Sequence, residues 1–469
     1  MAGQPDPVRG TVRSNAFTGD GSVAGRLGPG ADSWSLTGAN AGAPPHLMPA
    51  PIDPADWRDP RVGWGVVLPE PPGADPAALG TADDAPEPVR ALVAARSGKV
   101  LRYRPGAALG AWTLRDYAGG GDLLTAASPP GTGPKQLPMY LLICAGPAEI
   151  PWSVQYMLQP VRNVGRLDLA GDALANYVTA LLAGWPGSAA RYDAPLVWAV
   201  DFGGDDITAL MRTAIAAPVA DLFAADADMP AARYVDGAAA DATAASLAGA
   251  LAAASPALIV TTSHGMTGPL DDPAALRARL GALVDAARTP VDPAALLAAW
   301  QPDGAIWYAH ACCSAGADAP SSFHGLFDPA SPLARVLDGV AALGTATAPL
   351  PRALLGAPKP LRAFIGHVEP AFDWTLAFPP NHQDLTADIR DLLYRRLCAG
   401  TPVGLATADY YRPIASLLIR HDDAVRAYNA ATTDAATPLD MALYTKLTAH
   451  DRAALVTLGD PTAALPTPR

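Results

Sequence analysis

Between residues 138 and 313, short apolar runs alternate with segments of helical periodicity, and this alternation restricts the chain to a few folds. Helical patterns occupy 171–185, 206–225, 242–254 and 273–287. The apolar runs are PMYLLICAGPA (138–148), PLVWAVDFG (195–203), ALIVTTSHG (257–265) and AIWYAHACC (305–313). Strands that are joined through helices pair in parallel and are covered on both faces. The sequence therefore predicts an α/β fold, a mostly parallel sheet flanked by helices.

The segments on either side of this region divide the chain into four expected parts. Residues 1–60 are rich in Gly and Pro and have weak periodicity, which is typical of an irregular N-terminal arm. We expect an N-terminal α/β subdomain over 61–190 and a second, related α/β subdomain over 191–375. Amphipathic patterns beyond residue 380 predict a helical C-terminal part, 376–469.

Charge and cysteine usage exclude several classes of partner. The net charge is −12 and the basic residues form no cluster, so we expect no nucleic acid and no membrane as partner. No apolar run reaches the length of a membrane span, about 18–20 residues, and the N-terminus lacks a signal-peptide pattern. The chain has four cysteines and no CxxC spacing, which disfavours structural zinc and favours a reduced, cytoplasmic setting.

Two of the predicted strands end in reactive side chains. ALIVTTSHG ends in His264 and Gly265, and AIWYAHACC ends in Cys312 and Cys313, which follows His264 by 49 residues. Ligands of open α/β sheets bind at the carboxyl ends of the strands. A cysteine needs a proton acceptor to become a thiolate at neutral pH, and a histidine supplies one. The pattern therefore predicts a Cys-His dyad, with the amides of Gly265 and the nucleophilic cysteine as an oxyanion hole.

The histidine and the cysteines also have structural interpretations. A strand-end histidine or a buried cysteine, taken singly, is usually structural. His310 with Cys312 and Cys313 suggests a metal cluster by composition, but consecutive strand residues point to opposite faces and cannot converge on one ion. We therefore expect no metal, and the paired arrangement favours catalysis.

The motifs around the dyad resemble those of the caspase-like clan of cysteine peptidases, which includes caspases, metacaspases, gingipains and CHAT proteases. HACCSAG is similar to metacaspase and gingipain motifs in which glycine lies three positions after the nucleophile; Gly316 occupies that position relative to Cys313. YLLICAGPAEIPW with NVGRLDL, and VTLGDPTAALP at 456–466, are similar to further gingipain-like segments. The resemblance covers residues 138–466 and is closest in layout to gingipain-like and CHAT bacterial members.

The resemblance implies a caspase-like fold and a cysteine endopeptidase. Cys313 is then the nucleophile that forms a thioester, His264 transfers protons, and the amides of Gly265 and Cys313 hold the oxyanion; no cofactor is required. A protein or peptide substrate is implied, with roles in bacterial defence or regulated cell death and a gasdermin-like protein as an example. Alternatives are a partner-regulated pseudoenzyme scaffold and a peptidyl transferase that uses the same dyad.

Three acidic residues follow the strand at 195–200. Caspase-like folds build their specificity pocket in this region, so Asp201, Asp205 and Asp206 are candidate ligands of a basic P1 side chain. Helix capping before Ile207 explains Asp205 or Asp206 equally well. No acidic residue is identified from the sequence as an orienting partner of His264.

Overall fold

The computed structural model describes the backbone of residues 12–17, 22–25, 52–106, 110–378, 381–431 and 435–466. The chain divides into two units, Met1–Ile52 and Asp53–Arg469. In the first unit, β1 (Val12–Phe17) and β2 (Ser22–Gly25) form an antiparallel pair. Most of the expected irregular arm, 1–60, lies outside the described residues.

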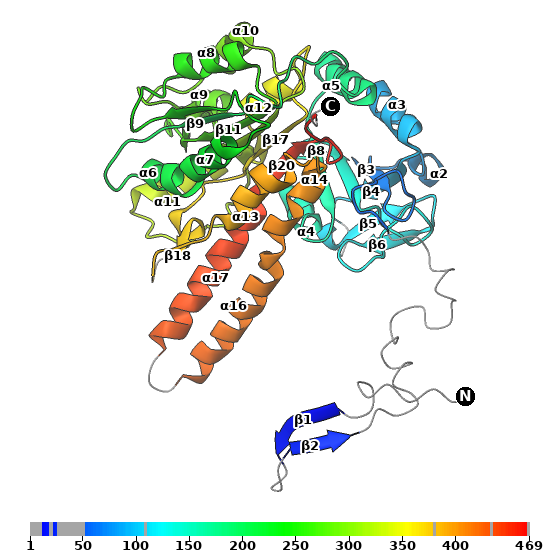
Figure 1. The fold of residues 1–469 in the computed structure, drawn as a ribbon. Helices are drawn as coiled ribbons and strands as arrows, with labels where there is room; N and C mark the ends of the chain where they lie inside the picture. Colours follow the sequence, from blue (N-terminus) through cyan, green and yellow to red (C-terminus); the bar gives the residue numbers. More distant parts are fainter. Residues whose placement is uncertain are drawn as a thin grey trace, which may run out of the picture. The chain divides into compact units, whose positions relative to one another are not determined.

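The second unit is built on one twelve-stranded sheet (Figure 1). Neighbouring strands are parallel except at β17–β20, β4–β5 and β5–β6. This confirms the predicted α/β class with a mostly parallel sheet. In spatial order the strands are β10 (Arg233–Asp236), β9 (Leu196–Ala199), β11 (Leu258–Thr262), β14 (Ile306–His310), β17 (Ala363–His367), β20 (Leu455–Gly459), β8 (Asn163–Leu167), β7 (Tyr140–Cys144), β3 (Trp64–Pro69), β4 (Lys99–Tyr103), β5 (Thr113–Asp116) and β6 (Gly121–Leu124).

The two expected α/β subdomains share this sheet and repeat one strand order. Around β9, the next strand in sequence (β10) lies on one side and the following strands (β11, β14) lie on the other. Around β3, β4 lies on one side and β7 and β8 lie on the other. Because β20 is antiparallel to β17 and parallel to β8, the two sets of parallel strands run in opposite directions. Their carboxyl ends therefore lie at opposite edges of the sheet.

Helices cover both faces of the sheet, and the strands alternate their side chains between the two layers. Trp198, Ile259 and Trp307 pack on one face, and Val197 and Val260 pack on the other. The first face is covered by α3 (Glu87–Arg96), α5 (Gly171–Ala183), α8 (Ala244–Ala254), α10 (Pro293–Ala299) and α12 (Pro349–Leu355). The second is covered by α4 (Trp152–Leu158), α6 (Ile207–Met211), η4 (Arg212–Ala216), α7 (Ala217–Ala225), α13 (Ala387–Arg390), η6 (Asp391–Arg396), α14 (Val403–Ala406) and α15 (Ala408–Tyr411).

Shorter elements complete the described fold. The helices are α2 (Pro76–Leu79), η3 (Gly110–Trp112), α9 (Pro273–Arg279), α11 (Pro332–Ala341) and η5 (Asp373–Thr375). Two-residue strands form three antiparallel pairs: β12 (His264–Gly265) with β13 (Leu283–Val284), β15 (Gly316–Ala317) with β16 (Ala346–Thr347), and β18 (Ala377–Phe378) with β19 (Gln383–Asp384).

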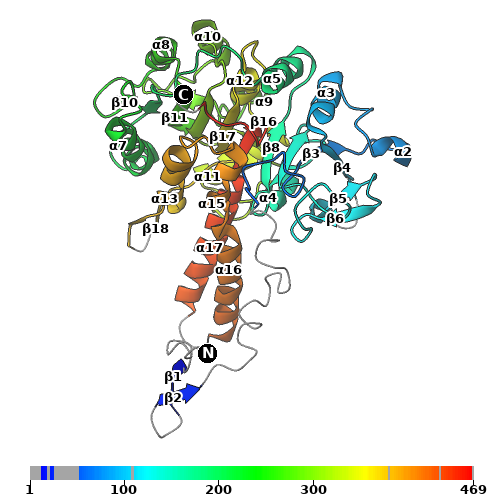
Figure 2. The same cartoon turned by 45° about the vertical axis from the view of Figure 1, so that its right-hand side comes forward.

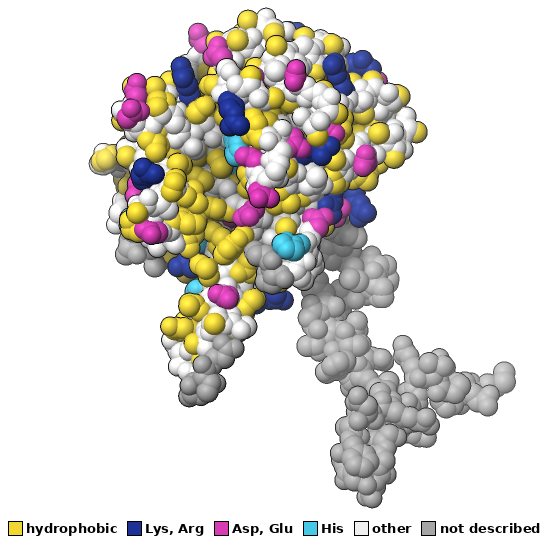
Figure 3. All heavy atoms as spheres, turned by 90° about the vertical axis from the view of Figure 1, so that its left-hand side faces the viewer, with side chains coloured by type: hydrophobic (Ala, Val, Ile, Leu, Met, Phe, Trp, Pro, Cys, Tyr) yellow, Lys and Arg dark blue, Asp and Glu magenta, His cyan; other side chains and the backbone are white. Residues whose placement is uncertain are grey.

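A helical hairpin, α16 (Pro413–Ala430) and α17 (Ala436–Ala454), projects from the body of the second unit (Figures 1 and 2). Half of the large hydrophobic side chains that are exposed in the described part of the chain lie on this hairpin. The space-filling view shows a hollow lined by hydrophobic side chains, with single acidic and basic side chains around it (Figure 3). The part of the chain after residue 380 is mainly helical, and its last strand, β20, lies at the centre of the sheet.

One helical segment, Ile207–Ala225, is as long and apolar as a membrane span. Its Ile215, Val219 and Phe223 are buried against the sheet side chains Val197 and Val260. The segment therefore packs as a core helix of this α/β unit.

Asp460, directly after β20, ties the end of the chain to its N-terminal half. Its buried carboxylate accepts hydrogen bonds from Trp64 Nε1 (3.1 Å) and Arg96 Nη1 (3.0 Å to each oxygen). Its N–H donates to the hydroxyl of Tyr177 on α5. When a buried charge is paired and hydrogen-bonded in this way, removal of one partner lowers the free energy of unfolding by several kcal/mol.

Gly165 on β8 is required by the close approach of β20. A Cβ built on Gly165 would lie 2.0 Å from the carbonyl oxygen of Gly459, a backbone atom that cannot move aside independently. We expect Gly165→Ala to lower the free energy of unfolding by about 1–3 kcal/mol, the usual range for overpacking. Gly249→Ala is the matched control, because a Cβ there meets nothing within 4 Å and the site is inside α8. It should stabilise by about 0.5–1 kcal/mol. Urea unfolding measures both; equal effects would contradict the close packing at the seam.

Candidate active site

Three parallel strands, β9, β11 and β14, end together at one edge of the sheet. Ala199, Thr262 and His310 are paired across them, so the residues that follow each strand emerge side by side. The helix after β9 leads to β10 over one face, and the helices after β11 lead to β14 over the other. Connections that diverge in this way open a crevice at the carboxyl ends, where α/β sheets bind ligands.

His264 lies at this edge, two residues beyond the end of β11. The short strand β12 pairs with β13, with His264 opposite Val284, and fixes the backbone there. The imidazole is stacked on Phe202, with ring centroids 5.7 Å apart, and 37% of the side chain is exposed. The ring is therefore held in place while remaining accessible to solvent.

Asp206 is the acidic partner of His264. Both carboxylate oxygens lie 3.1 Å from His264 Nε2, and Oδ1 also accepts hydrogen bonds from the N–H (2.9 Å) and hydroxyl (2.6 Å) of Thr208. Burial alone would raise the pKa of Asp206, but the hydrogen bonds from Thr208 and His264 hold that pKa below its ordinary value. Asp206 thus remains a carboxylate. In the described part of the chain no residue hydrogen-bonds to Nδ1 of His264, which leaves that nitrogen available to a thiol.

The structure brings His264 and Asp206 together from segments 58 residues apart, a pairing that was not predicted from the sequence. Asp206 also caps α6, as the alternative interpretation of this residue predicted. The sequence signal was an Asp immediately before a helix that follows a strand end, which also fits an ordinary cap.

Cys313, the predicted nucleophile, is not available for that role. Its side chain is fully buried among apolar residues of α9 and α11, and burial raises the pKa of its thiol well above the ordinary value. Its own N–H donates to the carbonyl of Glu369 (2.9 Å), so it cannot bind an oxyanion. The prediction failed because of the backbone at Cys313. Its φ is +56°, so its side chain does not follow the alternation between the two faces that holds for strand residues.

Cys312 is the cysteine that lies against Gly265, the residue after His264. It is partly exposed, and its thiol lies 3.9 Å from the carbonyl oxygen of Ala371. Burial raises the pKa of Cys312, and backbone groups of Ala371 and Gly265 near the sulfur oppose that rise. A Cβ built on Gly265 would lie 1.8 Å from the Cys312 carbonyl oxygen, so only glycine permits this approach.

The backbone N–H of Gly265 is directed toward Cys312. The next N–H, that of Met266, donates to Ala282 on the other side of the strand (2.9 Å), and successive amides of a strand point in opposite directions. The N–H of Cys312 forms no hydrogen bond to another residue within the described part of the chain. The amides of Gly265 and Cys312, rather than those of Gly265 and Cys313, are therefore placed to bind an oxyanion.

The three acidic residues considered for a basic P1 pocket do not assemble into one. Asp206 is bound to His264. Asp201 accepts from the N–H of Gly203 and lies 3.7 Å from Arg212, which also pairs with Asp236. Asp205 is exposed. The guanidinium of Arg288 lies over the ring of Phe202, 4.7 Å from its centroid, and brings a positive charge to the same crevice.

A buried polar cluster lies behind Cys312. His310 and His367 contact each other edge to face with ring centroids 4.8 Å apart, and Tyr308 hydrogen-bonds to His310 Nδ1 (2.8 Å). Burial lowers the pKa of His310 to about 4, so this ring is neutral near pH 7. Asp451 of α17 is fully buried with His367 nearby, 4.0 Å between Oδ1 and Nδ1, and burial raises its pKa to about 7. The described residues contain no group of three His, Cys, Asp or Glu suited to a metal ion.

In comparisons with known proteins, no protein-family model, no curated protein and no solved structure matches the chain.

The buried carboxyl group of Asp451 predicts a pH dependence of stability. Because its pKa is raised from about 4 to about 7, the unfolded chain releases this proton before the folded chain does. Its contribution to stability therefore falls as the pH rises from about 4 to 7 and is constant above that range. Asp451→Asn should be more stable than the wild type at pH 8, and the difference should shrink at pH 5. Thermal unfolding across this range measures the effect, with Asp440→Asn on the exposed part of α17 as control. A pH-independent difference would contradict the raised pKa.

Proposed function

We propose that the chain is a cysteine endopeptidase of the caspase-like type, with Cys312 as nucleophile, His264 as general base and acid, and Asp206 as the residue that orients His264. The observation that carries the proposal is His264, whose Nε2 is held by Asp206 while the Gly265 backbone lies against Cys312. A carboxylate, an imidazole and a thiol in this order form the usual arrangement for activating a nucleophile.

In the proposed reaction, His264 takes the thiol proton as the sulfur of Cys312 attacks the scissile carbonyl carbon. The negative charge that develops on the carbonyl oxygen is stabilised by the N–H groups of Gly265 and Cys312, and the donors of such holes contribute about 2.7–4 kcal/mol each. His264 then donates the proton to the leaving amine as the C–N bond breaks. Water, deprotonated by His264, hydrolyses the thioester and restores the thiol. Asp206 stabilises the imidazolium throughout.

A protein or peptide is the proposed substrate, because a crevice at the sheet edge with an activated thiol suits an acyl group in an extended chain. A gasdermin-like protein and a role in bacterial defence or regulated cell death remain expectations of the sequence resemblance. A half-exposed His264 that is held by a carboxylate favours an enzyme over the pseudoenzyme alternative. Product analysis by mass spectrometry separates hydrolysis from transfer to an amine.

The choice between the two adjacent cysteines is tested by substitution. We expect Cys312→Ala to abolish cleavage of a peptide library and Cys313→Ala to retain activity, because Cys312 lies against Gly265 while Cys313 is buried in an apolar cluster. Circular dichroism and thermal unfolding must show that both variants fold, since Cys313 is part of a buried apolar cluster. If Cys313→Ala is inactive while folded and Cys312→Ala is active, the assignment is reversed.

The role of Asp206 is tested by an isosteric change. Asp206→Asn retains a side-chain oxygen that can cap α6, but removes the negative charge beside His264. We expect kcat/KM to fall by about 10²-fold or more, the scale of general acid–base assistance.

Asp205→Asn is the matched control for this experiment, since Asp205 is the exposed neighbour. His264→Ala should cost at least as much activity as Asp206→Asn. Wild-type kinetics for Asp206→Asn would show that its contact with His264 has no part in the reaction.

A further inference from the structure

The N-terminal half of the sheet has a second crevice of the same topological kind. The connection from β3 to β4 passes through α3 over one face, and the connection from β7 to β8 passes through α4 over the other. The carboxyl ends of β3 and β7 therefore lie where the connections diverge, the position at which α/β sheets bind ligands. This crevice is at the opposite edge of the sheet from His264.

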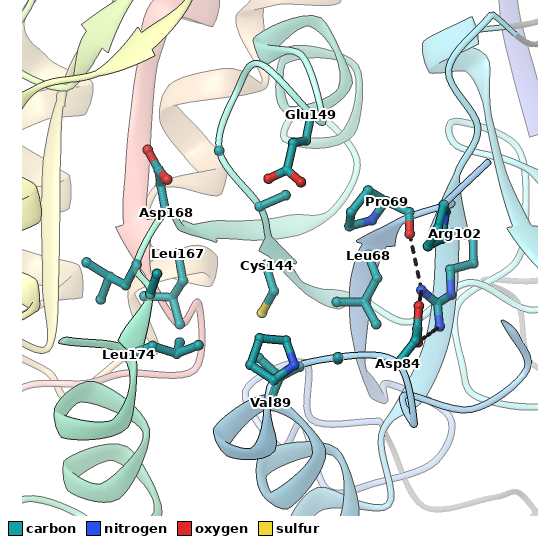
Figure 4. Close-up of a pocket in the computed structure, with 17 residues that line it drawn as sticks. Leu68, Pro69, Asp84, Val89, Arg102, Cys144, Glu149, Leu167, Asp168 and Leu174 are labelled. Carbon is teal, nitrogen blue, oxygen red and sulfur yellow. Dashed lines mark hydrogen bonds and ion pairs between the residues drawn. The ribbon is translucent and has the colours of Figure 1, made fainter. Parts of the chain in front are cut away.

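A cavity of about 330 Å³ occupies this crevice (Figure 4). Its floor is apolar and is formed by side chains from three strand ends and two helices. These are Leu68, Val89, Cys144, Leu167 and Leu174. Burial raises the pKa of Cys144 above its ordinary value, so this thiol stays protonated, and no histidine is among the described residues that line the cavity. The cavity is therefore suited to binding rather than to thiol chemistry.

The one arginine that lines the cavity, Arg102, has no donor left for a ligand. Its guanidinium forms two hydrogen bonds to the carboxylate of Asp84 (2.6 and 2.9 Å). It forms three more to the carbonyls of Pro69, Leu79 and Thr81. These five bonds match the five N–H donors of a guanidinium. The buried positive charge is also neutralised by Asp84, so it does not attract an anion.

The free charge of the cavity is negative. The carboxylate of Glu149 points into the space above Cys144 (Figure 4), and no side chain in the described part of the chain pairs with it. Asp168 borders the other side of the cavity, and its carboxylate lies 3.7 Å from Nε of the half-exposed Arg352. The helix ends nearby do not reverse this sign, because α3 and α5 each carry an acidic residue, Glu87 and Asp172, in the first turn.

We propose that this cavity binds a small organic cation, an alkylguanidinium or alkylammonium group whose apolar stem lies on the floor and whose charge pairs with Glu149. An apolar floor with one or two directed polar groups is the common design of small-ligand sites. A guanidinium and a carboxylate form paired, charge-assisted hydrogen bonds. The cation can belong to a free amine or to the side chain of an arginine or lysine in a peptide, since both present the same chemistry.

The test is isothermal titration calorimetry on the full-length chain with n-butylguanidine as the probe. n-Butylurea, a neutral analogue, and pentanoate, an anion, are the comparison ligands. We expect saturable binding of n-butylguanidine and binding of the other two weaker by at least about tenfold, because charge-assisted hydrogen bonds are stronger than neutral ones. Acetyl-arginine methylamide distinguishes the two sources of the cation. If it binds more strongly than n-butylguanidine, the natural ligand is a peptide side chain. If it does not bind, the natural ligand is a free cation. Both results support the site.

Three variants locate the binding. Glu149→Gln should weaken it by about 10- to 100-fold. Glu87→Gln, which removes the same charge from the exposed start of α3, should leave it unchanged. Ala170→Trp should abolish it, because Ala170 is an exposed residue on the cavity wall and the indole would fill the space.

Three results would overturn the proposal: no binding of n-butylguanidine to the folded wild type, equal binding of n-butylurea, or unchanged binding by Glu149→Gln. The same titration on Cys312→Ala separates this site from the proposed peptidase. Binding should be unaffected by that change, whatever the outcome for catalysis.

Discussion

The insertion of β20 between β17 and β8 is the constraint on which the rest of the structure depends. This strand is the last described segment to join the sheet, and it connects two sets of parallel strands that run in opposite directions. Gly165 and Gly459 allow the close approach, and Asp460 anchors the segment to Trp64 and Arg96. Without β20, β17 and β8 would each have an unpaired edge. The two halves therefore share one sheet, and the hydrophobic core on one of its faces extends across both.

This arrangement places two crevices at opposite edges of the same sheet. In the C-terminal half, the register of β9, β11 and β14 brings together the loops that carry Asp206, His264 and Cys312. In the N-terminal half, the same strand order creates a cavity with Glu149 and a protonated Cys144. The same topology thus carries the proposed Cys-His site at one edge and a cavity with an apolar floor and an acidic rim at the other. The chemistry of each crevice is set by the residues of its loops.

The alternation of apolar runs and helical patterns was sufficient to predict the α/β class and the edge at which His264 lies. It was not sufficient to choose between the two cysteines. That choice depends on the left-handed backbone of Cys313, which directs the Cys313 thiol into the core and leaves Cys312 at the edge of the sheet. The pairing of Asp206 with His264 was also inaccessible, since a helix-capping aspartate gives the same local pattern. β20 was missed because its pairing depends on strands nearly a hundred and nearly three hundred residues earlier in the chain.

The central claim is that Cys312 is a nucleophile activated by His264. Peptide mapping by mass spectrometry, after incubation with a pool of peptidyl acyloxymethyl ketones, tests it most directly, because these electrophiles alkylate an activated thiol irreversibly. The account predicts a single adduct on Cys312 in the wild type, and loss of that adduct in His264→Ala with the fold retained. An adduct on Cys313, or equal labelling of Cys312 without His264, would contradict the account.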